Sequence, residues 1–137
     1  MIKAKAVAVG ALTVILAMLV VVVLAVPLDR FVASQLAGGT VSVENLFLLT
    51  YWPIRIFTWI GLFLAIALGS YVATRVSRSD SNIHWLIMVV ALIGAIWAGY
   101  FWASNSDVSG PIISSIIAVA SGAIGHRVAR RRMQAAR

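Results

Sequence analysis

The chain has 137 residues, of which 62% are hydrophobic and only 11% are charged. Soluble domains contain about 45–50% apolar and about 25% charged residues, so this composition argues against a water-soluble fold. The absence of cysteine excludes disulfides, thiolate catalysis and cysteine-ligated metals. The formal net charge of +7 would favour a polyanionic partner if the basic residues were spread over one surface, but their positions show that they are not.

The first apolar segment covers residues 6–26 and contains no charged residue. As a helix it would reach about 31 Å, which matches the hydrocarbon thickness of a bilayer. The run is longer than the roughly 7–15 apolar residues of a cleavable signal peptide, so a retained signal-anchor helix is favoured. Pro27 opens the stretch 27–39, which predicts either a short amphipathic helix lying in the membrane interface or an irregular loop. Gly38 and Gly39 are natural stop signals for such a helix.

The second apolar segment, residues 46–74, is too long for one straight span of about twenty residues. Pro53 lacks an amide proton and disfavours helix at the residue before it, so we expect a bend there. The prediction is an external loop over 27–53 and a crossing over 54–75. Arg55 is then expected at the outer boundary, with its charge extended to the interface.

Two further spans are predicted at residues 84–103 and 110–128, each preceded by a short polar turn. Asp107 or Ser109 can cap the last helix, and Pro111 suits its first turn. The sequence therefore predicts an all-α, polytopic membrane protein. Its four transmembrane helices would form an antiparallel bundle with a short interfacial helix after the first span, as one domain over residues 1–137.

The basic residues predict which way the protein faces. With four spans, both termini lie on one side of the membrane, and two basic residues, Arg30 and Arg55, fall on the other side. The basic residues that share the side of the termini are Lys3, Lys5, Arg75, Arg78, Arg127, Arg130, Arg131, Arg132 and Arg137. The positive-inside rule therefore predicts a bacterial cytoplasmic (inner) membrane protein with both termini in the cytoplasm.

The C-terminal arginines Arg127, Arg130, Arg131 and Arg132 are interpreted first as topology anchors, with anionic lipid as a further partner. Nucleic-acid binding is disfavoured, because the tail has no aromatic residue for stacking. Arg55, Trp52 and Trp102 are expected to be anchors at the outer interface, and Trp85 at the inner one. The aromatic cluster at the outer ends of spans two and three has an alternative interpretation as a partner surface.

Small residues recur every four positions in three spans, and such stripes let transmembrane helices approach closely. We expect them to pack within the chain rather than in a homo-oligomer, with the fourth span central and the first span peripheral. The stripes are Gly61, Ala65, Gly69 and Ala73; Ala91, Ala95, Gly99 and Ala103; and Gly110, Ser114, Ala118 and Gly122.

No predicted span has an ionisable group at its midpoint, which argues against proton-coupled transport. His84 and His126 are predicted at the same membrane level, where two imidazoles can ligate haem or a metal, but no third ligand lies beside them. We expect no cofactor, and without catalytic motifs no enzymatic activity.

The leading hypothesis is a small accessory or scaffold protein that assembles with other membrane proteins or with itself. The alternatives are a small pore or holin-like permeabiliser, for which Ser114, Ser115 and Ser121 are the lining candidates, and a membrane immunity protein against a pore-forming toxin.

Overall fold

A computed structural model describes residues 3–37, 43–78, 82–103 and 107–136 of the chain. They form four α-helices and, within these ranges, no strand. The helices are α1 (Ala4–Ala37), α2 (Val43–Ser77), α3 (Ile83–Trp102) and α4 (Ser109–Ala135). Each helix is long and apolar enough to cross a membrane. The predicted all-α class with four such helices is therefore confirmed.

The first two helices continue through their prolines, where the sequence predicted interruptions. Pro27 lies inside α1 and Pro53 lies inside α2. Residues 28–37 are thus the C-terminal part of α1 rather than a separate helix, and the predicted external loop 27–53 is helical over 27–37 and 43–53. An internal proline removes one backbone hydrogen bond, and long helices packed against a neighbour tolerate this loss. At 34 and 35 residues, α1 and α2 are about 50 Å long, well beyond a bilayer core of about 30 Å.

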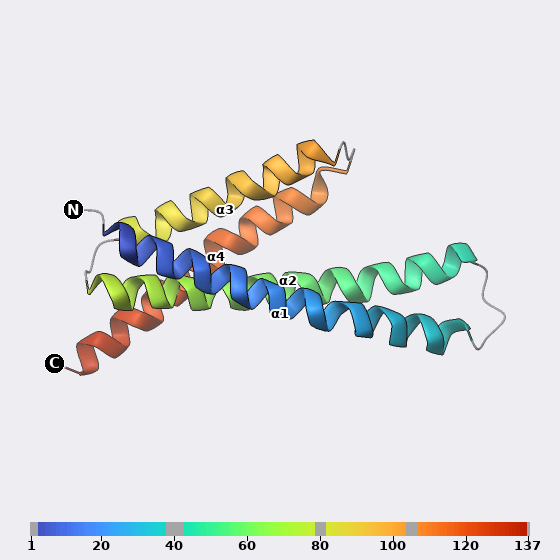
Figure 1. Ribbon diagram of the computed structural model, residues 1–137, viewed down its shortest axis with the longest axis horizontal. Helices are drawn as coiled ribbons and strands as arrows, with labels where there is room; N and C mark the ends of the chain where they lie inside the picture. The colour runs from blue at the N-terminus through green and yellow to red at the C-terminus, as the bar shows by residue number, and fades with distance from the viewer. Residues whose placement is uncertain (1–2, 38–42, 79–81, 104–106, 137) are drawn as a thin grey trace.

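Helix α1 lies beside α2, and α3 lies beside α4, with the chain reversing direction between the members of each pair (Figure 1). The starts of α1 and α3 and the ends of α2 and α4 lie at one end of the molecule. We name it the basic end, because it contains Lys3, Lys5, Arg75, Arg78, Arg127, Arg130, Arg131 and Arg132. At the opposite end, α1 and α2 project beyond the end of α3 and the start of α4.

Helix α2 packs against all three other helices, although the sequence favoured α4 for the central position. Its small-residue stripe faces α1: a Cβ atom at Gly61 would lie 2.6 Å from Val21 Cγ2, and Gly69 lies against Val14. Another side of α2 faces α4, where Gly125 lies against the backbone of Ala67. Small residues on two sides thus allow α2 to be central. Helix α1 is peripheral, as expected, with branched side chains exposed along much of its length.

The stripe on α3 does not pack inside the bundle, contrary to our expectation. Its four members, Ala91, Ala95, Gly99 and Ala103, are all exposed. Helix α3 instead turns its larger side chains inward, and the other helices supply the small residues that receive them. Met88 approaches Gly10 of α1, while Trp85 and Val89 lie against Gly122 of α4. Because the bulky residues fill the space between the helices, the small residues of α3 are left on the outside.

Candidate functional site

A cluster of buried polar side chains lies near the basic end, where α2, α3 and α4 meet. Each of these side chains is at most 7% exposed. Buried polar groups in an apolar surrounding are costly unless they form hydrogen bonds, so their partners determine what this cluster can do. The members are Ser70, Thr74 and Ser77 from α2, His84 and Trp85 from α3, and His126 from α4.

Thr74 and His126 join α2 to α4. The Thr74 hydroxyl donates to the carbonyl oxygen of Ser70 at 2.8 Å, and its oxygen lies 3.0 Å from His126 Nδ1. A hydroxyl has one proton to donate, so Nδ1 of His126 is the donor in the second bond when the Thr74 proton is directed to Ser70. The imidazole also stacks on Trp85, with ring centroids 5.9 Å apart and planes inclined by 28°. His126 is thus held from two sides.

His84 joins α3 to the start of α1. Its Nε2 accepts a hydrogen bond from the backbone amide of Lys3 at 3.1 Å, so this nitrogen carries no proton. The Lys3 ammonium donates to the carbonyl oxygen of Ser77 at 2.6 Å, which adds a contact from α1 to the end of α2. Lys3 therefore holds the start of α1 against both α2 and α3.

The two histidines predicted at one membrane level both lie at the basic end, but each has its own partner. Among the described residues, no three histidine, cysteine, aspartate or glutamate side chains are grouped as metal ligands. Buried polar atoms of the cluster that form no hydrogen bond to the described part of the chain include Ser70 Oγ, His84 Nδ1 and Trp85 Nε1. We name this cluster the polar junction, because its contacts connect the helices to one another.

Replacing His84 by leucine is expected to release the start of α1. The backbone amide of Lys3 loses its acceptor, and one neutral hydrogen bond contributes about 0.5–1.5 kcal/mol. Amide hydrogen exchange at residues 3–7 should therefore accelerate about two- to tenfold in the variant. Exchange in the middle of α1 serves as the internal reference, and unchanged exchange at Lys3 would show that its amide is protected by something other than His84.

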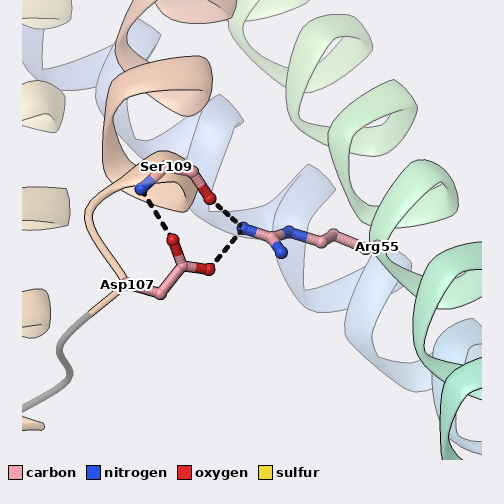
Figure 2. Close-up of polar contacts among 3 residues, drawn as sticks. All are labelled: Arg55, Asp107 and Ser109. Carbon is pink, nitrogen blue, oxygen red and sulfur yellow. Dashed lines mark hydrogen bonds and ion pairs between the residues drawn. The ribbon is translucent and has the colours of Figure 1, made fainter.

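A second polar group lies away from the basic end, where Arg55 of α2 meets the start of α4 (Figure 2). Arg55 Nη2 donates to Ser109 Oγ at 3.2 Å and lies 3.5 Å from Asp107 Oδ2. The other Asp107 oxygen accepts the backbone amide of Ser109 at 3.0 Å. The guanidinium carbon also lies 5.1 Å from the centroid of the Trp59 ring.

Asp107 and Arg55 differ in how much of each side chain is exposed. The Asp107 side chain is 54% exposed and the Arg55 side chain only 16%. Hydrogen bonds from Ser109, with a smaller contribution from Arg55, lower the pKa of Asp107, so this carboxyl group stays ionised at neutral pH. The sequence indicated Asp107 as a helix cap and Arg55 as an anchor. It gave no sign that the two residues meet, because they are far apart along the chain.

The other predicted anchors have different environments. Trp102 is 92% exposed, in keeping with an interfacial position, whereas Trp85 is buried against His126 and Gly122 and belongs to the core. The interpretation of Trp85 as an inner anchor was therefore wrong, because its ring packs against His126 and Gly122 of α4. Arg127, Arg131 and Arg132 are exposed and Arg130 is half-buried. The Trp52 side chain lies outside the described part of the chain.

Two apolar grooves run along the surface of the bundle. The first, of about 320 Å³, lies between α2 and α4 and is lined by Ile56, Trp59, Ile60, Phe63, Leu64 and Ile117. The second, of about 450 Å³, lies between α3 and α4 and is lined by Ile93, Ser115, Ile116, Val119 and Ala120. Both grooves lie within segments apolar enough to cross a membrane.

Four helices of this length and hydropathy, with apolar grooves on their outer surface, indicate a multi-pass membrane protein. Comparison with known proteins found no family model, curated protein or solved structure that matches the chain.

Proposed function

We propose that this protein is a non-catalytic accessory subunit that assembles with another membrane protein, and that the outer face of α3 receives a transmembrane helix of that partner. The observation that carries the proposal is the composition of this face. Its exposed small residues are Ala91, Gly94, Ala95, Ala98, Gly99 and Ala103. At Gly94 and Gly99, apart from the neighbouring residues and backbone of α3 itself, no atom of the described chain lies within 4 Å of the position that a Cβ atom would take.

The exposed face of α1 provides the contrast. It consists of bulky branched residues such as Leu16, Leu19 and Val23, whose exposed fractions lie between 55% and 68%. Such side chains mix readily with lipid tails, whereas small residues allow a second helix to approach the backbone and gain van der Waals contact. Of these two faces, that of α3 is therefore the better surface for a protein partner.

The remaining polar groups support assembly rather than conduction. Ser115 and Ser121, which were considered as pore-lining residues, donate hydrogen bonds to carbonyl oxygens four residues earlier in α4. In the described spans the charged side chains lie toward the ends of the span, as Arg55 and Arg75 do in the span Pro53–Ser77 of α2. A serine bonded to its own helix and a span without a central charge are typical of packing helices.

The proposed setting is the cytoplasmic membrane of a bacterium, with the helices as an antiparallel transmembrane bundle and the basic end in the cytoplasm. The gathering of lysine and arginine at one end of the molecule supports this orientation. Exposed arginines of α4 would there meet anionic lipid headgroups. The chain has no cysteine, so single cysteines introduced at positions 39, 79, 105 and 137 can be tested with a thiol reagent applied to one side of the membrane at a time. We expect positions 79 and 137 to react only with reagent on the cytoplasmic side.

Photo-crosslinking tests the partner surface. A photoreactive residue at Gly94 or Ala98 should form a crosslink to one membrane protein, whereas one at Leu19 of α1 should react with lipid. Substitution of Gly94 by isoleucine should then release the crosslinked protein in mild detergent, while Leu19→Ile should retain it. A crosslink between two differently tagged copies of the chain, or equal release by both variants, would contradict the proposal.

A further inference from the structure

The groove between α2 and α4 leads to the only ion pair found within the described part of the chain. Trp59 lines the groove, and its ring centroid lies 5.1 Å from the Arg55 guanidinium carbon. Ile56, the residue next to Arg55, lines the same groove. Asp107 lies 3.5 Å from the guanidinium. The apolar groove therefore lies directly beside a pair of opposite charges.

We propose that this groove and the Arg55–Asp107 pair form a binding site for a phospholipid with a zwitterionic headgroup that carries a primary ammonium, namely phosphatidylethanolamine. One acyl chain lies in the groove, the phosphate binds Arg55, and the ammonium binds Asp107.

The groove fits an acyl chain by its chemistry and its volume. All six lining residues are hydrophobic, and its volume of about 320 Å³ lies in the range of small-molecule sites. It lies between the membrane-crossing segments Pro53–Ser77 and Ser109–Ala135. A groove open to the hydrocarbon of a bilayer is filled by the surrounding lipid, because leaving it empty forfeits van der Waals contact.

Arg55 and Asp107 lie where the headgroup of a lipid in the groove would be. Arg55 is the third residue of its segment, and Asp107 comes two residues before the next one, so both lie at the membrane boundary. The planar guanidinium suits phosphate oxygens. The Asp107 carboxylate is 54% exposed and can accept hydrogen bonds from an ammonium group. Together they present a positive and a negative charge side by side, which complements a zwitterion better than a headgroup with one charge.

The second groove provides an internal control. It is larger, at about 450 Å³, and lies between α3 and α4. Its lining contains Ile116 and Ser115 but no charged side chain. It can take an acyl chain without distinguishing headgroups, so filling this groove should leave a preference for phosphatidylethanolamine unchanged.

Native mass spectrometry of the full chain, with added lipids of equal chain length, tests the site. The lipids are phosphatidylethanolamine, phosphatidylcholine and phosphatidylglycerol. Phosphatidylcholine keeps the phosphate but its methylated nitrogen cannot donate a hydrogen bond, and phosphatidylglycerol has no cation. We expect phosphatidylethanolamine to bind about two- to fivefold more tightly than phosphatidylcholine, the range of a solvent-exposed ion pair. Phosphatidylglycerol also meets the exposed arginines of α4, so its binding at this site is the part that is lost when the groove is filled.

Three variants locate the preference. Asp107→Asn should abolish the advantage of phosphatidylethanolamine over phosphatidylcholine, and Leu64→Trp should reduce binding of all three lipids by filling the groove. Ile116→Trp, in the second groove, should leave the preference intact. Equal binding of the three lipids to the unmodified chain would overturn the proposal without any variant. A preference that survives Asp107→Asn would overturn it equally.

Discussion

Substitution of Gly125 by alanine is expected to destabilise the bundle, whereas the same substitution at Gly94 is expected to stabilise it slightly. A Cβ atom at Gly125 would overlap the Ala67 carbonyl oxygen and lie 2.9 Å from its carbon atom. Backbone cannot rotate away as a side chain can, so α2 and α4 must separate. Overpacking of this kind costs about 1–3 kcal/mol of unfolding free energy. At Gly94 the space is open, and alanine gains about 0.5–1 kcal/mol from helix propensity.

The measurement is unfolding of the purified chain by sodium dodecyl sulfate from a mild detergent, followed by tryptophan fluorescence. Trp85 is a suitable reporter because its ring is stacked on His126 at the junction of α3 and α4. Helix content alone is a poor reporter, since transmembrane helices retain their backbone hydrogen bonds after they separate. If both variants shifted the midpoint in the same direction, the close approach of Gly125 to Ala67 would not exist in solution.

The contrast between the two glycines also shows what the sequence could reveal. Periodic small residues predicted that α2, α3 and α4 each have a face suited to close packing, and the four helices follow from hydropathy and length. The pattern carried no information on whether the face of α3 points inward. That outcome depends on the shapes of Trp85, Met88 and Val89, which fill the space toward the other helices and rotate the small face outward.

The polar contacts were harder to predict for a similar reason. His84 and His126 were correctly placed toward one end, because hydropathy locates the start of the third span and the end of the fourth, although α4 continues beyond His126 to Ala135. Their partners, Lys3 and Thr74, come from other parts of the chain, and these contacts depend on how each helix is rotated about its axis.

The ion pair was missed for the same reason. Arg55 and Asp107 were each interpreted from their local surroundings, and only the packing of α4 against α2 brings them to 3.5 Å. The predicted interruptions at Pro27 and Pro53 were wrong, because helix packing compensates for a single lost hydrogen bond.

Thr74→Val is expected to have the next largest effect on stability, and two other threonines provide matched controls. Valine keeps the shape of threonine but removes the oxygen that accepts the proton of His126 Nδ1. A buried donor that loses its acceptor costs about 1–3 kcal/mol, and interhelical bonds in membranes contribute up to about 1.7 kcal/mol. We therefore expect a loss of about 1–2 kcal/mol in the same unfolding assay. Thr13 and Thr58 donate only to carbonyl oxygens of their own helices, at Val9 and Ile54.

Thr13→Val and Thr58→Val should consequently change the unfolding free energy by about 0.5 kcal/mol or less, because no group on another helix loses a partner. A double variant with His126→Phe isolates the contact itself. If the bond between Thr74 and His126 stabilises the bundle, the losses from the two single substitutions should not add, since either one already breaks it. Additive losses, or equal losses at all three threonines, would mean that the hydroxyl of Thr74 acts only within α2. The polar junction would then contribute nothing to holding α4 against α2.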